Sequence, residues 1–233
     1  MPDEALPTPS YYPVLLDLRG RAAVVIGGDD VAAEKAAALA GCGAEVQALS
    51  PTFCEALLAQ AERGAVRLCQ RAYTPGDLAG AFVVVAATND PDLIEAIWQE
   101  TRQGGQLVNI VDQPRYCSFI LPSVLRRGAL TIAVSTEGAS PSLAKRIRQQ
   151  LEKLFPAAYA PYLRLAAAAR KRLRTGGVSY QQRDEFFGAY FASDTLTSLE
   201  QHDWAAAAET TATLLQRYGI EAQAATLEEE AKS

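Results

Sequence analysis

A glycine pair directly after an apolar segment is the first feature of this sequence that suits a chemical role. The run Ala22 to Ile26 is rich in β-branched residues and ends at Gly27-Gly28-Asp29. An alanine-rich segment with helical spacing follows at once, so the order predicts a strand, a tight turn and a helix, the opening of a dinucleotide-binding βαβ unit. The glycines would let the backbone approach a pyrophosphate, whose charge the helix N-terminus attracts.

The glycine turn departs from the fingerprint G-x-G-x-x-G/A at its middle position. Gly27 takes the first place and Ala32 the last, while Asp29 replaces the middle glycine. Backbone and pyrophosphate come closest at that position, so a carboxylate there adds bulk and like charge. The turn therefore indicates the fold more strongly than the ligand. The alternative is a turn that needs glycine only for its conformation and binds nothing.

Polar residues also end the later predicted strands, where a parallel sheet of this kind holds its ligands. Ser50 follows the strand 45–49, Thr88 follows the apolar run 81–87, and Asn109 lies in the strand 107–111. Folds of this kind often have Asp or Glu at the place of Ser50 to hold the adenosine ribose, so the choice between NAD and NADP stays open. The expected cofactor contacts are Gly27, Gly28, Asp29, Asp30, Val31, Ser50, Thr88 and Asn109.

Asp112 is the strongest single candidate for a catalytic residue. It comes directly after the buried strand that ends at Val111, and we expect it to face the same crevice as the glycine turn. A carboxylate there can act as a general base or bind a cation. The alternative is structural, because aspartate commonly ties a turn such as the one before Pro114.

A second polar loop, Ser135 to Pro141, lies between a predicted strand and a long predicted helix. Ser140 before Pro141 is a typical N-cap and first-turn pair, which favours a structural role for Ser140. Thr136 and Gly138 are suited to line a cleft. Cations in and before this helix can form a basic rim for a multiply anionic ligand, with a solvated helix face as the alternative; they are Arg115, Arg126, Arg127, Lys145, Arg146 and Arg148.

The elements that position these residues alternate between short apolar strands and helices. Strands are expected at 22–26, 45–49, 66–69, 81–87 and 107–111, and helices at 31–40, 52–63 and 91–103. This alternation predicts an α/β fold, a Rossmann-like parallel sheet covered on both faces. Two further strands, 119–121 and 130–135, and an all-helical region follow, with a tail that frays from Ala222. The expected parts are an NAD-binding domain over 11–117, a dimerisation segment over 118–150 and a helical domain over 151–220.

Composition excludes several classes of protein. A net charge of -5 gives no sign of nucleic-acid binding, and no apolar run reaches the length of about 18 residues that a membrane span needs. Met1 to Ser10 lacks the build of a secretory signal, and four cysteines without CxxC spacing argue against a disulfide framework. With a single histidine, a metal site is not expected. The default expectation is a cytoplasmic protein.

Several motifs in order give the chain its family resemblance. They include Val25-Ile26-Gly27-Gly28, Val85-Ala86-Ala87-Thr88-Asn89-Asp90, Val108-Asn109-Ile110-Val111-Asp112, Cys117-Ser118-Phe119-Ile120-Leu121-Pro122-Ser123 and Ser140-Pro141-Ser142-Leu143-Ala144. The chain resembles, over about residues 11 to 215, the precorrin-2 dehydrogenases, the NAD-binding module of siroheme synthases.

The resemblance implies a symmetric dimer that oxidises precorrin-2 to sirohydrochlorin with NAD, and in some members also inserts ferrous iron. It implies that Asp112 is the acid/base residue and that Thr136 lies near the tetrapyrrole. A substrate with many carboxylates suits the proposed basic rim. The residues expected at the substrate are Ser118, Phe119, Thr136, Gly138, Ser140 and Arg146.

Two acidic residues depart from the family pattern. Asp29 stands in its Gly-Gly-Gly motif and Glu137 in its Ser-Thr-Gly-Gly motif. Two like charges 4 Å apart repel by about 1 to 4 kcal/mol, depending on solvent access, so both residues oppose an anionic ligand. The alternative function is therefore a tetrapyrrole-binding or chelatase-only protein that has lost its use of NAD. Iron insertion and the choice of nucleotide are left open by the sequence.

Overall fold

The computed structural model describes residues 11–232, which form two compact units that divide after Leu121. The first unit contains a parallel sheet of β1 (Ala22–Ile26), β2 (Glu45–Leu49), β3 (Val66–Cys69), β4 (Val83–Ala86) and β5 (Leu107–Ile110), in the order β3-β2-β1-β4-β5. Its helices are α1 (Asp30–Ala40), α2 (Glu55–Glu62) and α3 (Pro91–Gly104), and a short 3-10 turn, η1 (Pro114–Tyr116), follows β5.

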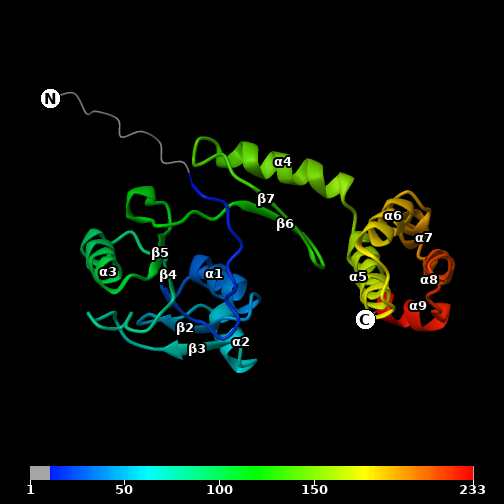
Figure 1. Ribbon diagram of the computed structural model, residues 1–233. Helices are drawn as coiled ribbons and strands as arrows, with labels where there is room; N and C mark the ends of the chain where they lie inside the picture. The colour runs from blue at the N-terminus through cyan, green and yellow to red at the C-terminus, as the bar shows by residue number, and fades with distance from the viewer. Residues whose placement is uncertain (1–10, 233) are drawn as a thin grey trace. The chain divides into compact units, whose positions relative to one another are not determined.

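Helices cover both faces of the sheet, because alternate side chains of each strand point to opposite faces. Ala23 and Val25 of β1 pack with α1 and α2 in one core cluster, and Val24 and Ile26 pack with α3 in another. Figure 1 shows α3 on one side of these strands and α1 on the other. The predicted doubly covered parallel sheet is confirmed. The chain reverses its winding between β1 and β4, which is where folds of this kind bind ligands.

The second unit begins with an antiparallel pair, β6 (Ser123–Arg127) and β7 (Leu130–Val134), followed by α4 (Pro141–Leu154). A helical bundle follows, made of α5 (Tyr159–Thr175), α6 (Tyr180–Phe191), α7 (Thr195–Glu200), α8 (Trp204–Gln216) and α9 (Ala224–Lys232). Its core includes Leu165, Phe186 and Tyr190, none of which is exposed. The prediction of a β segment followed by a helical region is confirmed.

Three local predictions were wrong. Residues 119–121 form no strand, and the first strand of the antiparallel pair begins later, at Ser123. Helix α2 starts at Glu55, three residues later than predicted. The C-terminal tail is not frayed over the described residues, since Leu227 and Ala231 of α9 are buried in the helical core.

The ordered tail has a physical cause in the charges of α5. Arg164 donates to the backbone oxygen of Ala231 over 2.8 Å from Nε, and Arg172 forms an ion pair of 2.8 Å with Glu230. A guanidinium near the C-terminus of a helix also meets the negative end of the helix dipole. These contacts join residues far apart in the chain, so local composition does not reveal them.

Candidate functional site

The glycine corner after β1 owes its shape to close packing. Gly27 has a φ of +133°, and a Cβ there would lie 2.9 Å from the backbone oxygen of Ala87 and 3.2 Å from the Cβ of Ala32. A Cβ on Gly28 would lie 1.8 Å from the backbone oxygen of Thr52. Both positions therefore require glycine, Gly27 for the approach of β4 and α1, and Gly28 for the approach of the loop after β2.

Asp29 occupies the N-cap of α1. Its Oδ1 accepts a hydrogen bond of 2.9 Å from the backbone N–H of Ala32, so the carboxylate satisfies one of the donors that a helix N-terminus leaves open. Within residues 11–232, the backbone N–H groups of Asp30 and Val31 meet no acceptor. The corner thus keeps two free donors for an anion next to one that its own side chain uses.

A cavity of about 610 Å³ opens at this corner, over the carboxyl ends of β1, β2 and β4. Its volume lies in the range of about 300 to 1,000 Å³ that small-molecule sites have. The predicted contacts Gly27, Gly28, Asp29, Ser50 and Thr88 all line it. Asp30, Val31 and Asn109 are not among its lining residues.

The cavity also has walls that the sequence analysis missed. The remaining lining residues lie at the ends of β1, β2 and β4, after β2 and β3, and at the start of α3: Ile26, Leu49, Ala87, Pro51, Thr52, Phe53, Cys54, Ala72, Tyr73, Asp90 and Leu93. Asp29 and Asp90 are its charged lining residues, and no lysine or arginine is among the residues that line it. A ligand with an added phosphate at the ribose would therefore meet no cation in this lining.

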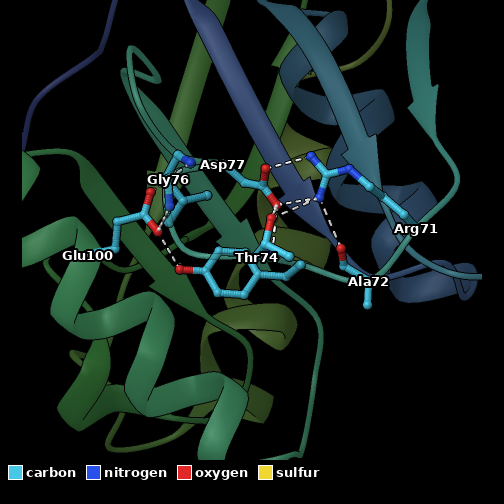
Figure 2. Close-up of polar contacts among 8 residues, drawn as sticks. Arg71, Ala72, Thr74, Gly76, Asp77 and Glu100 are labelled. Carbon is cyan, nitrogen blue, oxygen red and sulfur yellow. Dashed lines mark hydrogen bonds and ion pairs between the residues drawn. The ribbon is translucent and has the colours of Figure 1, made fainter.

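Two carboxylates, those of Asp77 and Glu100, hold the loop after β3 (Figure 2), and Glu100 also bonds to Tyr73. Asp77 pairs with Arg71, whose guanidinium lowers the pKa of that carboxyl from 3.8 to about 2. Glu100 of α3 accepts the Tyr73 hydroxyl, and burial together with this hydrogen bond raises the pKa of Tyr73. The only sequence signal for this wall was an Asp and a Gly in the stretch after β3, which is too common to point to a site.

Asp112 has a left-handed backbone, with a φ of +58°, two residues after the end of β5. A non-glycine residue adopts this conformation at a cost, although Asp tolerates it better than most. Its carboxylate is exposed and makes no hydrogen bond to any of the described residues, 11–232. The structural alternative for Asp112 thus lacks support here, since the side chain does not tie the turn.

The turn around Asp112 is tied by Cys117 instead. The single proton of the Cys117 thiol is shared between the backbone oxygens of Ile110 and Gln113, at 3.3 and 3.2 Å from the sulfur, and the sulfur accepts from the Ile110 N–H. Burial raises the pKa of this thiol, which keeps it protonated as a donor. Hydrogen bonds therefore hold the backbone before and after Asp112, while the Asp112 side chain has no hydrogen-bond partner among the described residues.

Asn109, Ser118 and Phe119 take part in hydrogen bonds that join β5 to the segment after the Asp112 turn. The Asn109 amide donates to the backbone oxygen of Phe119 over 3.0 Å, and the Ser118 hydroxyl accepts from the Val108 N–H over 2.8 Å. Asn109 was predicted to bind the cofactor, and Ser118 and Phe119 to bind the substrate. Those roles stay predictions, but Asn109 and Ser118 already use their side chains in hydrogen bonds to the backbone, Asn109 also contacts the Cys117 sulfur, and Phe119 packs against the core.

The predicted polar loop of the second unit lies between β7 and α4. Ser140 accepts from the Leu143 N–H as the N-cap of α4, so the structural role expected for it is confirmed. The Thr136 hydroxyl accepts from the Ser140 N–H over 3.0 Å. Glu137 and Gly138 have φ values of +51° and +87°, and the family's glycine at the place of Glu137 would adopt this conformation at less cost.

Arg146 lies on the exposed face of α4. It lines a small cavity of about 260 Å³ together with Gln149, Gln150 and Lys153 of the same helix. No group of three or more His, Cys, Asp or Glu that is placed to hold a metal ion occurs among residues 11–232. In the same part of the chain, every helix is too short or too polar to cross a membrane.

Two family models match the chain. Residues 14–123 match a family described as "Putative NAD(P)-binding", and residues 127–154 match "Sirohaem biosynthesis protein central". The first match contains every residue that lines the cavity, together with Asp112. The second contains β7 and all of α4.

Curated relatives and a solved structure agree with these matches. A siroheme synthase of Nitrosococcus oceani is 39% identical over 164 residues, which are 70% of this chain and 35% of that protein. Siroheme synthase 1 of Pectobacterium atrosepticum is 37% identical over 78% of this chain and 38% of that protein. The chain thus spans less than half the length of these relatives. The structure of SirC, a precorrin-2 dehydrogenase, matches with a TM-score of 0.73 and 26% identity over 89% of this chain and 100% of that one.

Proposed function

Because the chain belongs to the family of precorrin-2 dehydrogenases and siroheme synthase N-terminal regions, we propose that it oxidises precorrin-2 to sirohydrochlorin with NAD+. The observation that carries the proposal is the cavity at the glycine corner, whose lining residue Asp29 is followed in the chain by two helix N–H groups, those of Asp30 and Val31, that meet no acceptor among residues 11–232. A pyrophosphate is the kind of anion that such a corner binds.

The residues at the corner fit the nucleotide. Gly27 and Gly28 bring the backbone close, and the N–H groups of Asp30 and Val31 are free to donate to phosphate oxygens. When bound, NAD+ supplies the acceptor for a hydride from the substrate. The absence of lysine and arginine among the lining residues supports NAD+ over NADP+, because a 2′-phosphate would lack a cationic partner.

Asp112 is proposed as the proton acceptor of the reaction. Oxidation of precorrin-2 removes one hydride and one proton, and a base must take the proton. The Asp112 carboxylate is exposed at the carboxyl edge of the sheet and is not used by any described neighbour. Thr136, Gly138, Ser140 and Arg146 remain proposed contacts of the tetrapyrrole.

The test of this proposal is a calorimetric titration with NAD+ followed by anaerobic turnover of precorrin-2. We expect one nucleotide site per chain and the appearance of NADH absorbance. A folded protein that neither binds NAD+ nor forms NADH would contradict the proposal.

The bond between Asp29 and Ala32 favours a second candidate function. The Asp29 carboxylate accepts a hydrogen bond from the Ala32 N–H, which is the next N–H group of α1 after those of Asp30 and Val31. It also places a negative charge among the residues that line the cavity. A protein that binds or metallates the tetrapyrrole without a nucleotide is consistent with this arrangement. Tight binding of sirohydrochlorin with no binding of NAD+ would favour it, and iron insertion would then be measured directly.

We also propose that the active form is a homodimer. Helix α4 buries only Ala144 within the described chain, while Leu143 and Leu154 are 48% and 67% exposed, and the pair β6-β7 has no other strand beside it. An apolar helix face and open strand edges suit a second copy of the chain. Light scattering that gives the mass of a monomer would contradict the dimer. A cytoplasmic location is part of the proposal and is supported by four free cysteines.

A further inference from the structure

The loop between β3 and β4 forms one wall of the cavity, through Ala72 and Tyr73. We infer that Glu100, on α3, is a positioning residue for the nucleotide, because it holds this wall in place before the nucleotide binds. The inference rests on the proposed use of NAD+ and assigns a role to a residue that touches neither the cavity nor the proposed base.

The first fastening of the loop is internal. Arg71 forms a two-pronged ion pair with Asp77, with contacts of 2.6 and 2.5 Å, and also donates to the backbone oxygen of Ala72 over 3.0 Å. Asp77 in turn accepts from the Thr74 N–H over 2.7 Å. These bonds fold residues 71–77 on themselves (Figure 2), but they do not join the loop to another element.

Glu100 supplies that connection. Its Oε2 accepts from the Tyr73 hydroxyl and from the Gly76 N–H, the latter over 3.0 Å, and its Oε1 accepts from the Leu78 N–H over 2.8 Å. One carboxylate thus holds three donors across six residues of a loop without regular structure. Leu78 next to these bonds is fully buried, so the anchored end of the loop also packs in the core.

Helix α3 links the Glu100 contact to the cavity, because the same helix also carries residues that line it. Asp90, the N-cap of the same helix, and Leu93 in its first turn line the same cavity as the glycine corner. One rigid helix therefore sets the place of its own N-terminus and, through Glu100, of the Tyr73 wall. A site whose walls are held in advance binds its ligand without the entropic cost of ordering them.

The substitution Glu100→Gln tests the inference. It keeps the shape of the side chain, but an amide has one acceptor oxygen where the carboxylate has two, so three donors cannot all be satisfied. We expect a rise of about tenfold in the Kd and KM for NAD+, the equivalent of one strong hydrogen bond, with kcat and the KM for precorrin-2 unchanged. Hydrogen exchange at the Gly76 and Leu78 amides should become faster in the free protein.

The matched control is Glu95→Gln on the same helix. Glu95 is exposed, and its described bond is with Gln99, so this variant should leave nucleotide binding and loop exchange as in the wild type. Tyr73→Phe should raise the Kd for NAD+ by a smaller factor, since it removes one of the three donors and keeps the ring.

The outcomes separate the inference from the proposed function. If the wild type binds NAD+ and Glu100→Gln binds it equally well, the positioning role is wrong and the proposed function stands. If Glu100→Gln lowers kcat and the affinity for both substrates alike, Glu100 is a general structural residue and the inference also fails. If the wild type binds no NAD+, the proposed function fails and this inference fails with it.

Discussion

Asp29 and Asp112 follow two strands of the same sheet, β1 and β5, and both are exposed, but they differ in backbone conformation and in hydrogen bonding. Asp29 has an extended backbone, caps α1 and places its carboxylate 2.9 Å from the Ala32 N–H. Asp112 has a left-handed backbone and a carboxylate without a hydrogen bond to residues 11–232. The left-handed backbone at Asp112 has a conformational cost, which the hydrogen bonds of the turn offset without using the Asp112 side chain.

The difference indicates which of the two aspartates is the better candidate for a catalytic residue. A side chain that satisfies a local donor, as Asp29 does, is explained by the fold and needs no further role. A residue with a strained backbone whose side chain makes no hydrogen bond is a candidate for function, since its side chain adds nothing to the stability of the fold at that position. Cys117 holds the backbone on both sides of Asp112 and so provides the support that such a residue requires.

Asp112→Asn gives the largest expected effect. Asparagine also accepts a left-handed backbone, so the turn should keep its shape and the free energy of unfolding should change little. Loss of the base should lower kcat for precorrin-2 oxidation by about 10² to 10⁴-fold. The measurement is the anaerobic rate of NADH formation at saturating NAD+.

The control for this variant is Asp92→Asn, at an exposed position in the first turn of α3. It removes one charge from the same unit without touching the Asp112 turn, and it should leave kcat unchanged. Equal activity of Asp112→Asn and the wild type would remove the contrast between the two aspartates.

Gly28→Ala tests the packing side of the comparison. The new Cβ would lie 1.8 Å from a backbone oxygen of the loop after β2, so either that loop or the glycine corner must move. We expect the free energy of unfolding to fall by about 1 to 3 kcal/mol, as overpacking usually costs, with a loss of NAD+ affinity. Urea unfolding measures the first and calorimetry the second. Wild-type stability would mean that the loop gives way easily.

Asp29→Asn and Asp29→Gly separate the cap from the charge at the corner. Asparagine keeps the cap and removes the charge, while glycine removes both at a cost of a few tenths of a kcal/mol in stability. If the charge opposes the pyrophosphate, both variants should bind NAD+ at least about fivefold more tightly, the equivalent of about 1 kcal/mol. A Kd that both variants leave unchanged would show that Asp29 is no obstacle to the nucleotide.

Asp77 differs from both of these aspartates because an ion pair with Arg71 holds its carboxylate. Its substitution is expected to have the smallest effect. Its pKa is lowered from 3.8 to about 2, so its stabilising effect is complete above pH 4 and is lost as the pH falls through 2. Asp77→Asn should reduce stability at pH 5 and flatten the fall in stability between pH 4 and 2. Urea midpoints over this range test this, and parallel curves for variant and wild type would contradict it.

Much of the fold follows from local patterns. The apolar runs of β1 and β4 predict buried parallel strands, and Ser140 before Pro141 predicts the start of α4. The site was only partly predictable, because Tyr73 reaches the cavity through a loop whose shape depends on Glu100, 27 positions further along the chain. A residue pattern carries no information about such a distant partner.

The doubly covered sheet, the need for glycine after β1 and the place of Asp112 near a strand end follow from residue order alone, because they depend on neighbours in the chain. Three features depend on the three-dimensional structure: the Asp29 carboxylate caps α1, the Asp112 carboxylate has no hydrogen bond to residues 11–232, and Glu100 holds the cavity wall through hydrogen bonds. The physical reason is that hydrogen bonds and burial are settled by which segments meet in space.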